Sequence, residues 1–149
     1  MGNLLNQLPK FSFEKTSNAN RNIIYETFSD YENYQKICPK FFPSVRIRSV
    51  RDNVAVVEEH LILGDDELVI MAKHVTNRPV LHEVFVIGGD AKGSHIQEQF
   101  IEMDNGTKIL IDVDLKLKGK MKLGSVFSKN RYQLSYEEIL DNLIKIAEN

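Results

Sequence analysis

The chain has 149 residues, of which 42% are hydrophobic and 27% charged, and its formal net charge at pH 7 is -2. These values predict one globular domain over residues 1–149, large enough to enclose a cavity. The small net charge argues against nucleic acid as a partner, and no apolar run is long enough to span a membrane. The first residues lack a signal-peptide core, so we expect a cytoplasmic location.

The N-terminal part predicts a strand followed by two short helices. Residues 11 to 16 alternate in polarity as a strand does, and the segment Ser17 to Asn20 offers side chains that favour helix N-caps. The apolar residues that follow have helical spacing, and a second short helix ends at Cys38-Pro39. Cys38 is the only cysteine, so an intramolecular disulfide is excluded.

The middle of the chain predicts an antiparallel meander. Alternating segments are separated by short runs rich in Gly, Asn, Asp and Pro, which favour tight turns between strands that are neighbours in space. The expected strands cover about 44–51, 54–63, 67–76, 80–87, 94–103 and a last strand that follows Asn105-Gly106.

A long C-terminal helix is expected from about Met121 onward. Its apolar stripe consists of Tyr132, Tyr136, Ile139, Leu140, Leu143 and Ala147. Ser135 and Glu138 have the spacing of a capping box, so the pattern favours one helix with a local irregularity near residue 135.

This order of elements resembles the helix-grip fold of the START-like, polyketide cyclase and Bet v 1-like (SRPBCC) superfamily. Residues 24–34 followed by Pro39 look like the first helical segment of that family, and Asn105-Gly106-Thr107-Lys108-Ile109 looks like its turn into the last strand. The resemblance implies an α+β fold with a curved antiparallel sheet of about seven strands. The long C-terminal helix would cover the sheet and enclose a cavity for a hydrophobic small molecule or lipid.

Hairpin geometry predicts which residues of each strand face inward, starting from the last strand and working back through the sheet. Ile111 and Val113 belong to the apolar side of that strand. An Asn105-Gly106 turn would pair Phe100 with Ile111 and Glu98 with Val113, which places Glu98 and Phe100 on the same face. A loop near Ala91 would pair Phe100 with His82 and Glu98 with Val84. Two further turns make His82 and then His74 inward. The interior should therefore combine apolar side chains with ionisable ones.

Which residues of the strand at 54–63 face inward depends on the length of the turn that follows it. A loop centred on Asp65 would place Glu58 and His60 inward and Glu59 outward, whereas a two-residue turn would invert the strand. With the first geometry, the predicted ligand-binding residues are Glu58, His60, His74, His82, Glu98, Phe100, Ile111 and Val113.

The inward ionisable groups allow four interpretations. They could form a mutually hydrogen-bonded network, orient a bound ligand, bind a metal, or act in general acid and base catalysis. A divalent metal such as zinc would use His74 and His82 with Glu58 or Glu98, although no local ligand motif accompanies them.

The leading hypothesis is binding or carriage of a hydrophobic small molecule or lipid, with no cofactor required. One alternative is a cyclase, dehydratase or hydrolase that uses the cavity His and Glu residues, although the sequence assigns no catalytic residue. Another is an interaction or assembly factor. The outward residues are unusually apolar, which predicts a homodimer through the outer sheet face or a bulge that turns some of them inward. These residues are Val57, Leu61, Val69, Met71, Val75, Leu81, Phe85 and Ile87.

Overall fold

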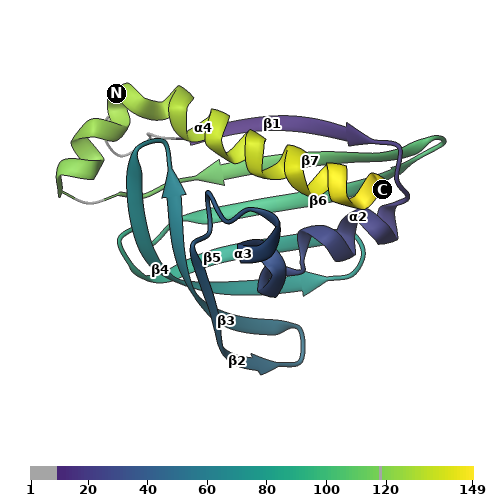
Figure 1. Ribbon diagram of the computed structural model, residues 1–149, viewed down its shortest axis with the longest axis horizontal. Helices are drawn as coiled ribbons and strands as arrows, with labels where there is room; N and C mark the ends of the chain where they lie inside the picture. Colours follow the sequence, from purple (N-terminus) through teal and green to yellow (C-terminus); the bar gives the residue numbers. More distant parts are fainter. Residues whose placement is uncertain (1–9, 118) are drawn as a thin grey trace, which may run out of the picture.

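The computed structural model describes residues 10–117 and 119–149, with side chains described for 10–117 and 131–149. One antiparallel sheet of seven strands, in the order β1-β7-β6-β5-β4-β3-β2, curves around the molecule (Figure 1). The strands are β1 (Lys10–Ser17), β2 (Ser44–Arg51), β3 (Val54–Leu63), β4 (Asp66–Asn77), β5 (Leu81–Gly89), β6 (His95–Met103) and β7 (Gly106–Asp114). The predicted meander is confirmed, and β1 closes it by pairing with β7.

The helices lie on one side of the sheet (Figure 1). They are α2 (Arg21–Phe28), the short η1 (Tyr31–Asn33), α3 (Tyr34–Ile37) and the long α4 (Gly119–Glu148). The side chain of Asn20 caps α2 by accepting from the Ile23 amide at 3.0 Å. The α4 helix is one continuous element through Ser135, which confirms the predicted single helix, while the irregularity near residue 135 stays a prediction. The Ser135 hydroxyl accepts a hydrogen bond from the Gly64 amide at 2.9 Å.

Polar contacts hold α4 against the end of the sheet. Glu148 accepts from the Ser17 hydroxyl at 2.7 Å and from the Asn18 amide at 3.1 Å, which fixes the C-terminal turn to the end of β1. Farther back, Lys15 on β1 pairs with Glu137 at 3.0 Å and with Asp141 at 3.1 Å. The apolar stripe of α4 is thereby directed into the core, where Tyr132, Ile139, Leu140 and Leu143 are buried.

The strand registers differ from the predicted ones by even steps at the last two hairpins. Phe100 faces Ile109 and not Ile111, and Glu98 faces His82 and not Val84. Side chains alternate with a period of two, so an even shift leaves each residue on its predicted face. For this reason His82, Glu98 and Phe100 point inward as expected, despite the wrong partners.

The β3 strand is shifted by an odd step, and its predicted face is wrong. Leu63 pairs with Asp66, which leaves a two-residue turn with Gly64 at a φ of 60°. This turn inverts the strand, so that Glu59 is buried and Glu58 faces outward. Val57 and Leu61, predicted on the outer face, also turn inward.

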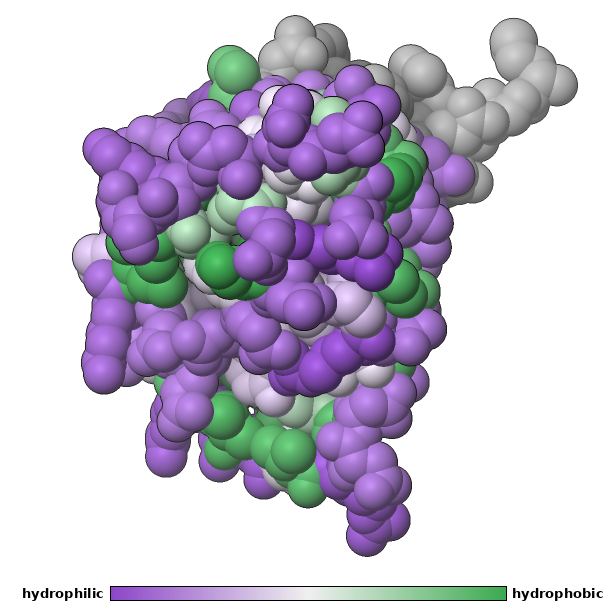
Figure 2. Space-filling view, turned by 90° about the vertical axis from the view of Figure 1, so that its right-hand side faces the viewer, coloured by the Kyte–Doolittle hydropathy of each residue, from purple (hydrophilic) through white to green (hydrophobic). Residues whose placement is uncertain are grey.

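The outer face is therefore less apolar than predicted. Val69 and Ile87 remain 53% and 45% exposed, but Val57 is fully buried. On the face seen in Figure 2, hydrophobic groups form separate patches among polar ones. The homodimer stays a prediction. Within the described residues, no helix is both long enough and apolar enough to cross a membrane.

Replacing Gly106 with Ala should destabilise the fold by more than about 2 kcal/mol, because backbone strain and overpacking add. Its φ is 143°, and a Cβ atom there would lie 1.9 Å from the carbonyl oxygen of Ser17. Urea unfolding measures the effect. Gly88→Ala is the control, since its Cβ would meet only the Met71 side chain at 3.4 Å; equal losses for both variants would contradict the register of β1 against β7.

Candidate functional site

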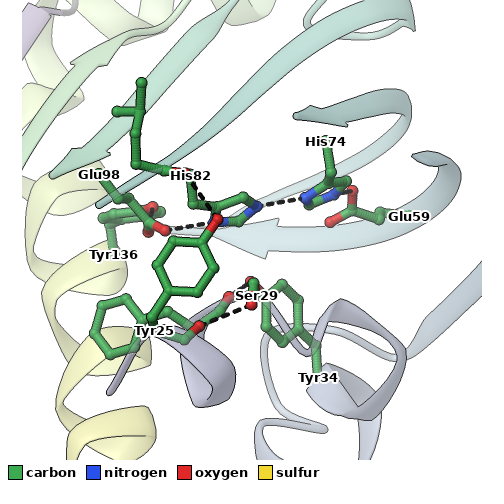
Figure 3. Close-up of polar contacts among 10 residues, drawn as sticks. Tyr25, Ser29, Tyr34, Glu59, His74, His82, Glu98 and Tyr136 are labelled. Atoms are coloured by element: carbon green, nitrogen blue, oxygen red, sulfur yellow. Dashed lines mark hydrogen bonds and ion pairs between the residues drawn. The ribbon is translucent and has the colours of Figure 1, made fainter. Parts of the chain in front are cut away.

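A continuous chain of hydrogen bonds crosses the inner face of the sheet (Figure 3). The Tyr136 hydroxyl donates to Glu98 at 2.7 Å, and the other oxygen of Glu98 lies 2.7 Å from Nδ1 of His82. Nε2 of His82 is 2.9 Å from Nδ1 of His74, whose Nε2 is 3.0 Å from Glu59. The two imidazoles are each 1% exposed and the two carboxylates 3%. We call these five residues the polar chain.

Four neighbouring strands each contribute one residue to the polar chain. Glu98 on β6 and His82 on β5 are directly opposed, and His74 on β4 is diagonal to His82. Glu59 on β3 is farther along the sheet, with the pair Val57 and Ala72 between it and His74 in the register. The long Glu59 side chain spans that gap, and the small side chain of Ala72 leaves room for it.

The helix side supplies the last member of the polar chain. Burial, together with the negative charge of Glu98, raises the pKa of the Tyr136 phenol well above its ordinary value. Tyr136 is therefore a permanent donor to Glu98. Burial likewise raises the pKa of Tyr34, whose hydroxyl donates to the carbonyl oxygen of Phe28.

The geometry sets the number of protons in the three contacts that the histidines of the polar chain make. A hydrogen bond needs one proton between its two heavy atoms, so the three contacts among Glu98, His82, His74 and Glu59 require three protons. Two neutral imidazoles carry only two. If both donated to their carboxylates, two lone pairs would face each other at the contact between the rings. The three contacts therefore hold one proton more than the two imidazoles supply, and the four groups carry a net charge of -1 when Glu59 Oε1, which is in none of these contacts, is unprotonated.

An enclosed cavity of about 60 Å³ lies between the sheet and α4, beside the polar chain. All five members of the chain line it, and most of the remaining wall is apolar. His74 also lines an open groove of about 460 Å³ on the surface, together with Tyr31 and Arg78. The His74 ring contacts the Tyr31 ring at an interplanar angle of 34°, with centroids 4.6 Å apart, and His74 is common to the walls of the cavity and the groove.

Two of the predicted site residues are not at the cavity. Glu58 faces outward and is bound by Arg48 at 2.9 Å, and this guanidinium lowers the pKa of the Glu58 carboxyl. His60 lies 3.6 Å from Glu67 on the same outer side. The inverted β3 strand explains both errors.

The remaining predicted residues are on the inner face, but only some reach the cavity. His74, His82, Glu98 and Val113 line it, whereas Phe100 and Ile111 belong to the packed core. Phe100 packs edge-on against Tyr25, with the ring centroids 5.0 Å apart. The residues with a predicted ligand-binding role thus form a smaller set, and that role stays a prediction.

Sequence reasoning missed Glu59 and Tyr136 as members of the site. The two-residue turn at Gly64 was the signal for Glu59, because that turn alone reverses the strand. Tyr136 was recognised only as part of an apolar stripe. Of the predicted metal ligands, Glu58 lies on the other face of the sheet, whereas His74, His82 and Glu98 lie together and are hydrogen-bonded to one another. Within the described residues, no group of three or more His, Cys, Asp or Glu side chains is placed to hold a metal ion.

No family model and none of the curated proteins matches the sequence. Several solved structures are similar to this chain in fold. A START superfamily protein from Mycobacterium smegmatis has a TM-score of 0.77 at 14% identity, with 93% of this chain and 97% of that chain covered. The Zhui aromatase/cyclase from Streptomyces sp. R1128 has 0.75 at 13% identity, with 93% of each chain covered. The major latex-like protein 151 of Panax ginseng has 0.68 at 8% identity, covering 94% and 97%.

This chain has the helix-grip fold. The predicted α+β architecture is confirmed, with a curved seven-stranded sheet and a long C-terminal helix over it. At these identities the likeness concerns the fold alone. The helix-grip fold positions the cavity, while the polar chain comes from this sequence's own residues.

Replacing Tyr136 with Phe should destabilise the protein by about 1–3 kcal/mol, because one oxygen of the buried Glu98 loses its donor. Urea unfolding followed by circular dichroism measures this loss. Tyr31→Phe is the control, since the Tyr31 hydroxyl makes no hydrogen bond within the described part of the chain and its removal should change stability by less than about 0.5 kcal/mol. If Tyr136→Phe is as mild as the control, the hydrogen bond to Glu98 does not form.

Nuclear magnetic resonance of protein with ¹⁵N-labelled histidine should detect one proton shared between His82 Nε2 and His74 Nδ1. The contact between the two rings requires it at pH 7. His60 and His95, the other two histidines, provide reference signals without a histidine partner. Finding both facing nitrogens unprotonated would contradict the three-proton arrangement.

Proposed function

We propose that this protein binds a small, mainly apolar molecule with one polar group in the cavity between the sheet and α4. The supporting observation is the combination of an apolar wall with a single polar side, the polar chain. Sites for small molecules commonly have this composition, in which apolar burial provides affinity and a few polar groups fix orientation. No covalent step is required.

The size of the cavity limits the ligand. About 60 Å³ holds roughly four water-sized groups, whereas sites for drug-sized ligands enclose about 300–1,000 Å³. A ligand with one ring therefore needs the wall to move outward slightly. The α4 side chains Tyr136 and Ile139 form part of that wall. A lipid chain would require a much larger displacement, so we favour a compact ligand.

The affinity should come mainly from the apolar wall. Removing apolar surface from water contributes about 25 cal/mol per Å². Leu68, Ile70, Val84, Val86 and Ile139 are among the aliphatic residues that supply this surface. A polar atom of the ligand can contact the polar chain on one side of the cavity, which gives the bound molecule a direction.

Phenol and toluene provide a matched pair of probes, because they have the same shape and differ in one hydroxyl. Both should bind in the millimolar range, and phenol should bind more tightly through a hydrogen bond to the polar chain. Changes in the ¹H–¹³C spectra of Ile, Leu and Val methyl groups during titration measure the binding. The largest changes should come from methyl groups that line the cavity.

Val86→Phe should fill the cavity and reduce the affinity for both probes at least tenfold. Ile87→Phe is its control, since Ile87 is the next residue on the same strand but lies on the outer face. Binding of either probe that is insensitive to Val86→Phe would place the ligand elsewhere. Absence of any methyl shift with saturating phenol and toluene would refute the proposed function.

A further inference from the structure

We propose that the cavity selects a small primary amine, bound as the ammonium ion with its apolar group against the aliphatic wall. This inference rests on the proposed function and specifies the polar group of the ligand. Three observations carry it: the net charge of the polar chain, the lack of a hydrogen-bonded cation on its carboxylates among the described residues, and one oxygen of the buried Glu59 side chain that has no donor there.

The first observation is the charge. The three contacts among Glu98, His82, His74 and Glu59 hold three protons, so the four groups carry a net charge of -1 when Glu59 Oε1, which takes part in none of these contacts, is unprotonated. Tyr136 and Tyr34, the two tyrosines that line the cavity among the described residues, stay neutral because burial raises the pKa of each well above its ordinary value. A negative charge is thus enclosed in a largely apolar interior, where charge interactions are strengthened.

The second observation concerns the cations. In the described part of the chain, neither carboxylate of the polar chain receives a hydrogen bond from a lysine or arginine. The guanidinium of Arg78, at the edge of the surface groove, pairs with Glu26 and lies over the Tyr25 ring at 5.4 Å. Lys40 pairs with Glu138. These positive charges serve other partners, so the net charge of the polar chain is available to a ligand.

The third observation is a free acceptor. Both oxygens of Glu98 accept hydrogen bonds, one from Tyr136 and one from His82. Glu59 uses only Oε2, in its contact with His74, and its Oε1 has no hydrogen-bond donor in the described part of the chain. In Figure 3 only one oxygen of Glu59 is joined to His74 by a dashed line. Glu59 is 3% exposed and lines the cavity, so this oxygen can accept from a bound ligand.

An ammonium ion satisfies these observations better than a hydroxyl does. Both could donate to Glu59 Oε1, but only the ammonium offsets the charge of the polar chain. Charge-assisted hydrogen bonds are also roughly twice as strong as neutral ones. The aromatic rings of Tyr34 and Phe42 line the same cavity and can contact a cation through their faces. A carboxylate ligand would meet repulsion instead.

Benzylamine, benzyl alcohol and benzoate test the proposal, because each joins one ring to a different polar group. At pH 7, where a primary alkylamine is protonated, benzylamine should bind at least tenfold more tightly than benzyl alcohol, and benzoate should not bind. Methyl chemical shifts of the wild-type protein measure all three. Benzoate or benzyl alcohol binding as tightly as benzylamine would overturn the inference without any variant.

Glu59→Gln tests the acceptor directly. The Gln carbonyl oxygen can still accept from His74, but the negative charge is removed, so benzylamine should lose at least tenfold in affinity while benzyl alcohol changes less than threefold. Glu58→Gln is the matched control, since Glu58 is the adjacent carboxylate on the outer face. An equal effect of the two variants on benzylamine would also overturn the inference.

The two proposals fail in different ways. If phenol, toluene and the three benzyl probes all leave the cavity methyl groups unchanged, the proposed function itself is wrong. If phenol or benzyl alcohol binds in the cavity and benzylamine has no advantage, only the amine selectivity is wrong.

Discussion

The contact between two imidazole rings inside the sheet is the interaction on which the site depends. It joins two histidine–carboxylate pairs into one unit, because neither ring can satisfy both of its nitrogens without the other. Burying such groups singly would cost several kcal/mol each, and the shared arrangement offsets that cost. The consequence is a core in which strand positions, side-chain rotamers and proton number are mutually fixed.

Most of this fold could be predicted from local patterns, because the alternation of apolar residues survives errors in register. The hairpins at β6–β7 and β5–β6 were placed two positions away from their true pairing, yet His82 and Glu98 kept their predicted face. At the β3–β4 hairpin the error was one position, and it exchanged Glu58 for Glu59. Whether the register is shifted by an odd or an even number of residues therefore decides which carboxylate enters the core.

The rest of the site could not be predicted for a different reason. Tyr136 meets Glu98 only because α4 is held across the sheet by contacts near residue 148, far from either group in the sequence. Periodicity shows that Tyr136 faces the sheet, but it does not show which strand lies opposite. The same holds for Glu59 and His74, which reach each other across the intervening pair of Val57 and Ala72.

The small volume of the cavity is consistent with the buried charge of the polar chain. A larger apolar chamber would admit water, which could hydrate Glu59 and weaken the electrostatic effect of the buried charge. A fully packed interior would instead leave Glu59 Oε1 against apolar atoms with no donor. The observed volume of about 60 Å³ lies between these limits. It leaves room beside one carboxylate oxygen for a donor that none of the described residues supplies, which connects the architecture of the core to ligand binding.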